Sequence, residues 1–246
     1  MGTPGEFVRV VKTPPIGRIV LSRPEKRNAM TTEMVRAVAN GCRELDADAE
    51  TEFIVLSGEG ASFSSGGDLR ERGNAVYGFQ DAWEILASGH DLVQSIEQAS
   101  KVVVAQVQGH AHAGGLLLAL CSDITVAGES TRFRVPELLR ARPDPFIPLR
   151  LVAKVGRERA AELMFTAREI DGREAYRIGL VSRCVADDAL EDEVHSVLDA
   201  IAATDRKSRA VWKRLLAQAR TPVDPWTFSQ AFATPETAGR SYGFTG

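Results

Sequence analysis

The sequence predicts an α/β fold in which strands alternate with helices along most of the chain. Short runs rich in β-branched and aromatic residues recur, and glycine-containing turns follow several of them. Segments with the helical spacing of apolar residues come after these turns. This alternation favours parallel strand pairing through right-handed crossovers. A length of 246 residues suits one large domain or a domain with a small appendage.

The elements follow from local patterns. In chain order, the predicted strands lie at 16–21, 53–56, 101–107 and 123–127, and the predicted helices at 31–46, 80–99, 116–121, 189–203 and 206–220. Thr31 or Thr32 is suited to cap the first of these helices. Two glycine-rich stretches, 62–69 and 109–115, are expected to be turns. We therefore expect an α/β core at 1–186 and a helical C-terminal region at 187–246.

Composition excludes several classes of function. The chain is 44% hydrophobic and 26% charged with a net charge of −3, which gives no general attraction to nucleic acid or to an anionic membrane. Three widely spaced cysteines form neither a disulfide framework nor a zinc motif, so we expect no metal site. No signal peptide and no membrane-spanning stretch is recognisable. A cytoplasmic protein is the resulting expectation.

The two glycine-rich turns are the strongest candidates for chemistry. Each follows a strand and precedes a helical or apolar run, in Phe63-Ser64-Ser65-Gly66-Gly67-Asp68-Leu69 and in Gly109-His110-Ala111-His112-Ala113-Gly114-Gly115. Free N–H groups at a helix N-terminus attract a developing negative charge, so two converging turns would form an oxyanion hole. Spacing alone leaves ordinary tight turns as an open alternative. The stretch Gly58-Glu59-Gly60 lacks the third glycine of a dinucleotide-binding fingerprint. No serine occupies the Gly-x-Ser-x-Gly elbow of a serine hydrolase.

Four ordered motifs resemble the crotonase, or enoyl-CoA hydratase/isomerase, superfamily. They are the stretch from Arg23 to Met30, the two glycine-rich turns with the later Cys121-x-Asp123, and the segment from Arg173 to Val181. The resemblance implies a crotonase-like spiral of ββα units whose helical C-terminal region drives assembly of a homotrimer or a hexamer. It also implies a coenzyme A thioester as substrate, with no other cofactor.

The resemblance assigns roles to particular positions. It implies that the backbone N–H groups of Gly67 and Gly114 stabilise the enolate of an acyl thioester. Coenzyme A would lie along Arg27, Asn28 and Ala29 and along Asp68, Leu69 and Arg70, where the Arg70 guanidinium is suited to a phosphate. A solvated surface charge is the alternative for Arg70.

The resemblance implies that a hydratase of this family uses two glutamates as acid and base. Only one of the two is present in this sequence. The first position falls on Leu117, which cannot transfer a proton. The second falls on Glu137, in Val135-Pro136-Glu137, where an apolar pocket would raise its pKa. One base suffices to move a double bond, so we expect Δ3,Δ2-enoyl-CoA isomerisation more than hydration.

Three further residues are candidates for the site. Asp144, in Pro143-Asp144-Pro145, matches the spacing of dienoyl-CoA isomerases, although aspartate between prolines also forms turns. His112 precedes Gly114 by two residues, and His90 lies on the helix expected to cover the pocket. Either histidine is suited to orient a substrate or to tune Glu137, and simple packing is the alternative.

Two functions of another class remain as alternatives. A non-catalytic acyl-CoA-binding member of the fold is compatible with Leu117, but retention of Glu137 favours an enzyme. RNA binding would call for a lysine-rich helix at 31–46. That helix carries Arg36 and Arg43 against three acidic residues, so we expect no nucleic-acid partner.

Overall fold

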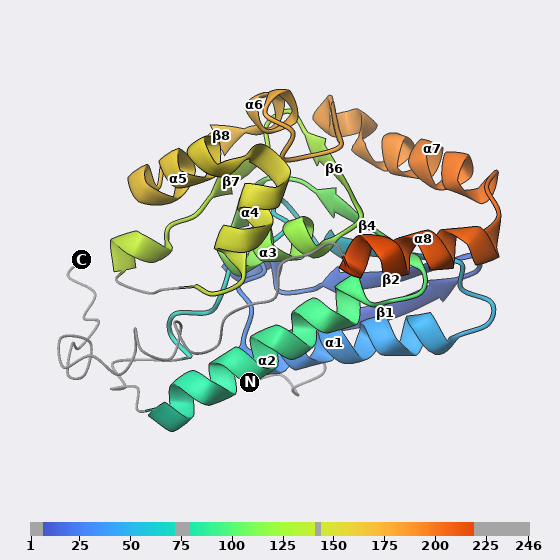
Figure 1. Ribbon diagram of the computed structural model, residues 1–246, viewed down its shortest axis with the longest axis horizontal. Helices are drawn as coiled ribbons and strands as arrows, with labels where there is room; N and C mark the ends of the chain where they lie inside the picture. The colour runs from blue at the N-terminus through green and yellow to red at the C-terminus, as the bar shows by residue number, and fades with distance from the viewer. Residues whose placement is uncertain (1–6, 72–78, 141–143, 219–246) are drawn as a thin grey trace.

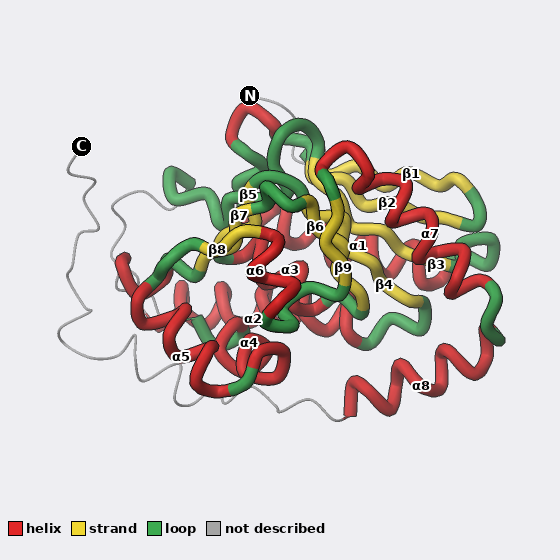
Figure 2. The backbone as a smooth tube through the Cα atoms, turned by 90° about the horizontal axis from the view of Figure 1, so that it is seen from above, coloured by secondary structure: helices red, strands yellow, loops and turns green. Residues whose placement is uncertain are grey.

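Six strands form the larger of the two β-sheets in the computed structural model, which describes residues 7–71, 79–140 and 144–218. The strand order is β1-β2-β3-β4-β6-β9, and Figure 2 shows these strands side by side. Only β1 and β2 pair antiparallel within this sheet; the later pairs are parallel. The strands are β1 (Val8–Thr13), β2 (Ile16–Leu21), β3 (Phe53–Gly58), β4 (Val102–Val107), β6 (Ile124–Gly128) and β9 (Arg183–Val185).

Helices cover both faces of this sheet, and the central strands are apolar on both sides for that reason. In β3, Ile54 and Leu56 belong to the larger hydrophobic cluster, which includes the buried faces of the helices α1 to α5. Phe53 and Val55 alternate with them and join a second cluster with α7. The helices are α1 (Thr32–Ala47), α2 (Phe79–Glu97), α3 (Gly114–Cys121), α4 (Ile147–Val155), α5 (Arg157–Thr166), α6 (Gly172–Arg177), α7 (Leu190–Ala202) and α8 (Arg206–Gln218).

A second, three-stranded sheet lies beside the N-terminus of α3. It consists of β5 (His110–His112), β7 (Arg132–Arg134) and β8 (Ile170–Asp171), with β5 parallel and β8 antiparallel to β7. The first glycine-rich turn joins this sheet through a β-bridge between Ser64 and Ala111. The small sheet therefore ties the first turn to the chain that leads into α3.

The predicted elements are confirmed, with differences at their ends. Thr31 is the N-cap of α1, and its hydroxyl accepts the Met34 N–H at 3.1 Å. The expectation that residues 109–115 form only a turn was wrong, because they contain β5 and the first residues of α3. Three residues are too few for strand alternation to be visible, and β5 exists because distant β7 supplies its hydrogen bonds.

The C-terminal helices pack on the rest of the molecule (Figure 1). Buried apolar side chains of α7 contact the large sheet. In α8, Lys213 is 4% exposed, and its Nζ lies 2.7 Å from Asp123 Oδ2 and donates to the carbonyl of Lys101 at 2.7 Å. The expected boundary at residue 186 remains a prediction. The part of the predicted C-terminal region beyond residue 218 lies outside the described residues.

No helix within the described ranges is long and apolar enough to cross a membrane.

Candidate active site

Hydrogen bonds hold the two glycine-rich turns against each other. The Ser64 N–H donates to the His110 carbonyl at 2.8 Å, and the His112 N–H donates to the Ser64 carbonyl at 3.0 Å. The Ser64 hydroxyl is buried and donates to the Asn28 carbonyl at 2.9 Å. Backbone bonds over three segments of the chain therefore set the relative position of the turns.

Gly67 and Gly114 are brought together with their N–H groups unused. Met30 brackets Gly67, since its N–H donates to the Gly66 carbonyl and its carbonyl accepts the Asp68 N–H, both at 2.7 Å. Gly114 is the first residue of α3, so its N–H has no acceptor inside the helix. Neither N–H has a hydrogen-bond acceptor among the described residues.

The two glycines lie close together, and Gly67 leaves room for a ligand. A Cβ on Gly114 would lie 3.9 Å from the Gly67 nitrogen and 3.0 Å from the Met30 Cε. No described atom lies within 4 Å of the position that a Cβ on Gly67 would take. Two free donors around open space are the arrangement that stabilises an oxyanion.

Asn28 is a structural centre of the first motif. It is fully buried with φ of 53°, a left-handed conformation that asparagine tolerates better than most residues. Its Oδ1 accepts the Arg23 N–H at 2.7 Å, and its Nδ2 donates to the carbonyls of Glu59 and Ser62 at 3.0 and 2.7 Å. The Asn28 side chain is thus fully engaged, and so is its backbone, whose N–H donates to the Arg23 carbonyl at 2.9 Å and whose carbonyl accepts the Ser64 hydroxyl.

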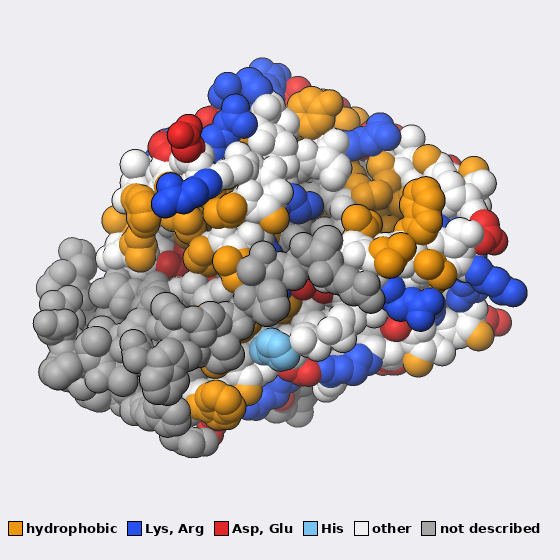
Figure 3. Space-filling view, in the orientation of Figure 1, with side chains coloured by type: hydrophobic (Ala, Val, Ile, Leu, Met, Phe, Trp, Pro, Cys, Tyr) orange, Lys and Arg blue, Asp and Glu red, His pale blue; other side chains and the backbone are white. Residues whose placement is uncertain are grey.

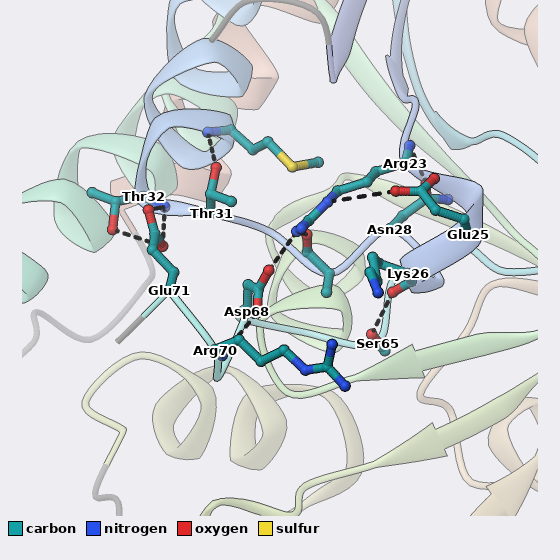
Figure 4. A network of polar contacts seen from close by, with 12 residues as sticks. Arg23, Glu25, Lys26, Asn28, Thr31, Thr32, Ser65, Asp68, Arg70 and Glu71 are labelled. Atoms are coloured by element: carbon teal, nitrogen blue, oxygen red, sulfur yellow. Dashed lines mark hydrogen bonds and ion pairs between the residues drawn. The ribbon is translucent and has the colours of Figure 1, made fainter. Parts of the chain in front are cut away.

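Asp68 is engaged as well (Figure 4). Its Oδ2 pairs with the Arg23 guanidinium at 2.5 Å, and its Oδ1 accepts the Arg70 N–H at 2.9 Å. Burial raises the pKa of Asp68, but the Arg23 guanidinium and the backbone N–H groups of Arg70 and Glu71 outweigh it and hold that pKa below the ordinary value. The sequence carried no sign of this pair, because its partners are 45 positions apart.

Cationic side chains surround this network. Lys26, Arg27 and Arg70 are exposed, and their charged groups form no ion pair with a described residue. Figure 4 shows the Arg70 side chain extending away from the Arg23–Asp68 pair. Ala29 and Leu69 lie half-buried beside these cations. The arrangement suits a phosphorylated ligand.

Glu137 is the first residue of the 3-10 turn η2 (Glu137–Arg140). Its carboxyl is largely removed from solvent, and its Oε2 is buried with no hydrogen-bond partner among the described residues. The pKa of Glu137 is raised to about 7. Burial is the larger cause of this rise, and the negative charge of Asp144 is the second. A carboxyl with this pKa is suited both to take up and to give back a proton near neutral pH.

Asp144 lies close to Glu137 but is bound to the backbone. Its Oδ1 accepts the N–H groups of Phe146 at 2.8 Å and Ile147 at 2.7 Å, where α4 begins. Burial raises the pKa of Asp144, against the opposing effect of these N–H groups and of Arg150. Its visible interactions are those of an aspartate that stabilises the turn into α4.

Leu117 lies in a helix with no acid/base group near its start. It is 5% exposed, and the residues from Gly115 to Cys121 are all buried and apolar. The first-glutamate position of the motif is therefore part of a hydrophobic environment.

The two histidines lie apart from Glu137 in their interactions. His90 is exposed on α2, with its Nε2 3.0 Å from the Gln94 amide nitrogen. The His112 Nε2 lies 3.1 Å from Glu169 Oε2, and burial lowers the pKa of His112 to about 4 despite that carboxylate. Within the described residues, the charged neighbours that shift the pKa of Glu137 are Asp144 and Arg140, and neither histidine is among them. The contact between Glu169 and His112 was not predicted, because the small sheet brings these two distant residues together.

Free backbone donors and a buried carboxyl with a raised pKa are the components of a site that stabilises an oxyanion and transfers a proton. The described residues contain no group of three side chains suited to hold a metal ion. The chain belongs to the enoyl-CoA hydratase/isomerase family, whose model matches residues 12–232.

Proteins of several bacteria are similar to the chain. The probable enoyl-CoA hydratase echA8 of Mycobacterium leprae (strain TN) is 32% identical over 199 residues, which are 80% of this chain and 76% of that protein. A Thermobifida fusca YX structure in complex with CoA has a TM-score of 0.80 at 30% identity and covers 92% and 90% of the two chains. A monofunctional enoyl CoA isomerase from M. smegmatis has a TM-score of 0.73 at 28% identity and covers 94% and 97%. The crotonase fold predicted from the motifs is thereby confirmed.

Proposed function

We propose that the protein isomerises the double bond of an enoyl-CoA thioester, with Glu137 as its single acid/base. The observation that carries this proposal is the buried Oε2 of Glu137, which has no hydrogen-bond partner among the described residues. The free N–H groups of Gly67 and Gly114 add the donors that such a reaction needs. The apolar environment at Leu117 supports it. Hydration would need two carboxylates to activate a water, and α3 supplies no second carboxylate.

In the proposed reaction on a 3-enoyl-CoA, Glu137 as carboxylate removes a proton from Cα, which lies between the thioester carbonyl and the double bond. The electrons of the broken C–H bond move toward the carbonyl and form a dienolate, whose oxygen accepts the N–H groups of Gly67 and Gly114. The protonated Glu137 then returns the proton to Cγ, the carbonyl re-forms, and the double bond lies between Cα and Cβ. One proton leaves and one returns, so the reaction needs neither a redox cofactor nor water as a reactant.

The nucleotide part of coenzyme A is proposed to lie along residues 27–29 and 68–70. The exposed cations Arg27 and Arg70 are suited to its phosphates. Asn28 and Asp68 would contribute indirectly, because their side chains hold the motif together. The Thermobifida fusca structures in complex with CoA and with acetoacetyl-CoA support a CoA thioester as the ligand.

Two other reactions keep specific support. Hydration is favoured by the names of relatives such as the Mycobacterium leprae protein. Dienoyl-CoA isomerisation with Glu137 and Asp144 is favoured by the proximity through which Asp144 raises the pKa of Glu137. A non-catalytic acyl-CoA-binding protein would have no use for a buried carboxyl with a pKa of about 7.

A substrate panel tests the proposal. Purified protein is given 2-enoyl-, 3-enoyl- and 3,5-dienoyl-CoA, and product formation is followed by absorbance together with deuterium incorporation at Cα. We expect 3-enoyl-CoA to be converted to 2-enoyl-CoA, with loss of activity in Glu137→Gln. Rapid hydration of crotonyl-CoA that survives Glu137→Gln would refute the single-base mechanism. Binding of thioesters without any exchange would favour the non-catalytic alternative.

We also propose assembly into a homotrimer or a hexamer. In support, α8 carries Val211, Trp212, Leu215 and Leu216, all at least 45% exposed. Figure 3 shows hydrophobic side chains gathered over this helix. Apolar patches of this kind mark interaction surfaces. Light scattering after size-exclusion chromatography tests the assembly, and a monomer at micromolar concentration would contradict it.

A further inference from the structure

Ala113, directly before Gly114, has a backbone conformation that residues with a side chain rarely adopt. Its φ is 53° and its ψ is −124°, and it is one of four non-glycine residues with positive φ among the described residues. Glycine populates this region readily, whereas a Cβ makes it unfavourable. Such conformations persist only where the surrounding structure imposes them, and they concentrate at functional sites.

Hydrogen bonds on both sides impose this conformation. The Ala113 N–H donates to the Arg134 carbonyl on β7 at 3.1 Å, and its carbonyl accepts the Leu117 N–H at 3.0 Å. Arg134 is itself held, since its Nε donates to the Ala167 carbonyl at 2.7 Å. Ala113 is therefore fixed between the small sheet and the first turn of α3.

The Ala113 methyl group lies against the other glycine-rich turn. A Cβ on Gly66 would lie 2.5 Å from the Ala113 Cβ, so the methyl occupies the space that a larger residue at 66 would need. Gly66 directly precedes Gly67, and Ala113 directly precedes Gly114. The residues before the two free donors are thus in direct contact.

We propose that Ala113 is a positioning residue, whose methyl group, pressed onto Gly66 by the constrained backbone, sets the spacing of the Gly67 and Gly114 N–H groups. The proposal rests on the proposed function of these donors as an oxyanion hole. A gap at this contact would let the turns move relative to each other. Oxyanion stabilisation depends on donor geometry, so the rate would fall although every proton-transferring group remained.

Ala113→Gly tests the proposal, because it removes the methyl group while the backbone conformation becomes easier to adopt. We expect kcat for isomerisation to fall by about tenfold or more, with a much smaller change in KM. The thermal unfolding midpoint should stay equal or rise, because the positive φ no longer opposes a side chain. Ala113→Ser, which keeps a Cβ, should retain most of the activity.

Ala167→Gly is the matched control. Ala167 also has positive φ, at 50°, but ends α5, and its methyl group is not among the atoms that meet Gly66. Its bond to Arg134 uses the backbone carbonyl, which Ala167→Gly keeps. It should leave kcat unchanged. An unchanged kcat in Ala113→Gly, or an equal loss in Ala167→Gly, would overturn the proposal.

A measurement without substrate separates this proposal from the proposed function. Nitrogen-15 relaxation of the amides of Gly67 and Gly114 reports their order on the fast timescale. Order lost at both amides in Ala113→Gly, and kept in Ala167→Gly and Ala113→Ser, supports the positioning role even if no thioester reacts. Unchanged order in Ala113→Gly overturns it, whereas a wild-type protein inactive on the whole panel overturns the isomerase proposal alone.

Discussion

Replacing Glu137 by glutamine should strongly lower activity and at the same time stabilise the protein at neutral and higher pH. Burial and Asp144 raise the pKa of Glu137 from 4.5 to about 7, so the folded protein binds this proton more tightly than the unfolded chain. The stability that accompanies the bound proton is fully present below pH 4.5 and is lost as the pH rises through about 7. Glutamine resembles the protonated carboxyl at every pH.

The magnitude follows from the size of the shift. A change from 4.5 to about 7 corresponds to about 3 kcal/mol of unfolding free energy, as an upper figure. Glu137→Gln should therefore exceed wild type by up to about 3 kcal/mol at pH 8 and by almost nothing at pH 4.5. Loss of the acid/base should lower kcat by roughly 10²–10⁴. In wild type, the basic form should decline about fiftyfold between pH 7 and pH 5, and kcat with it.

Urea unfolding at a series of pH values measures the stability difference, and initial rates over the same series measure the activity. The exposed Glu50 provides the control, since Glu50→Gln should change neither quantity. A stability gain of equal size at pH 4.5 and pH 8 would refute the link to ionisation. A Glu137→Gln enzyme that keeps wild-type kcat would refute the catalytic assignment.

Further predictions concern the neighbours of this carboxyl and the first motif. Asp144→Asn keeps an oxygen for the N–H groups at the start of α4 but removes a charge. The pKa of Glu137 should then fall, and the acidic limb of the pH–rate profile should move to lower pH. Asp144→Ala should in addition lower the free energy of unfolding in urea by about 1–2 kcal/mol. Asn28→Ala removes three buried hydrogen bonds and should lower unfolding free energy by roughly 2–4 kcal/mol, against little change in the exposed control Asn40→Ala. Arg70→Gln should raise KM for CoA thioesters by about tenfold with kcat retained, whereas exposed Arg36→Gln should not; equal effects would argue against a phosphate contact at Arg70.

Much of the fold was predictable because its signals are local. The apolar run that became β4 and the Thr31 cap of α1 are visible within a few residues. The short strands β5, β7 and β8 were not predictable. Each exists through hydrogen bonds to a strand far away in the chain, and three residues or fewer carry too little alternation to be recognised.

The site shows the same division. Glu137 and the glycines 67 and 114 were recognisable from motifs, since their residue types are set by chemistry and backbone geometry. Their surroundings were not recognisable. The Arg23–Asp68 pair and the contact of Ala113 with Gly66 join positions 45 and 47 residues apart, and no sequence period connects them.

The sequence by itself determined the α/β class, the family resemblance and the loss of a carboxyl at Leu117, because these depend on residue identity and on local spacing. Only the tertiary structure decided that Asp144 lies close enough to Glu137 to raise its pKa, and that the Asn28 side chain is part of the scaffold. Burial and charge coupling are properties of the space around a group. They arise when distant segments pack together, and the order of residues in one segment does not contain them.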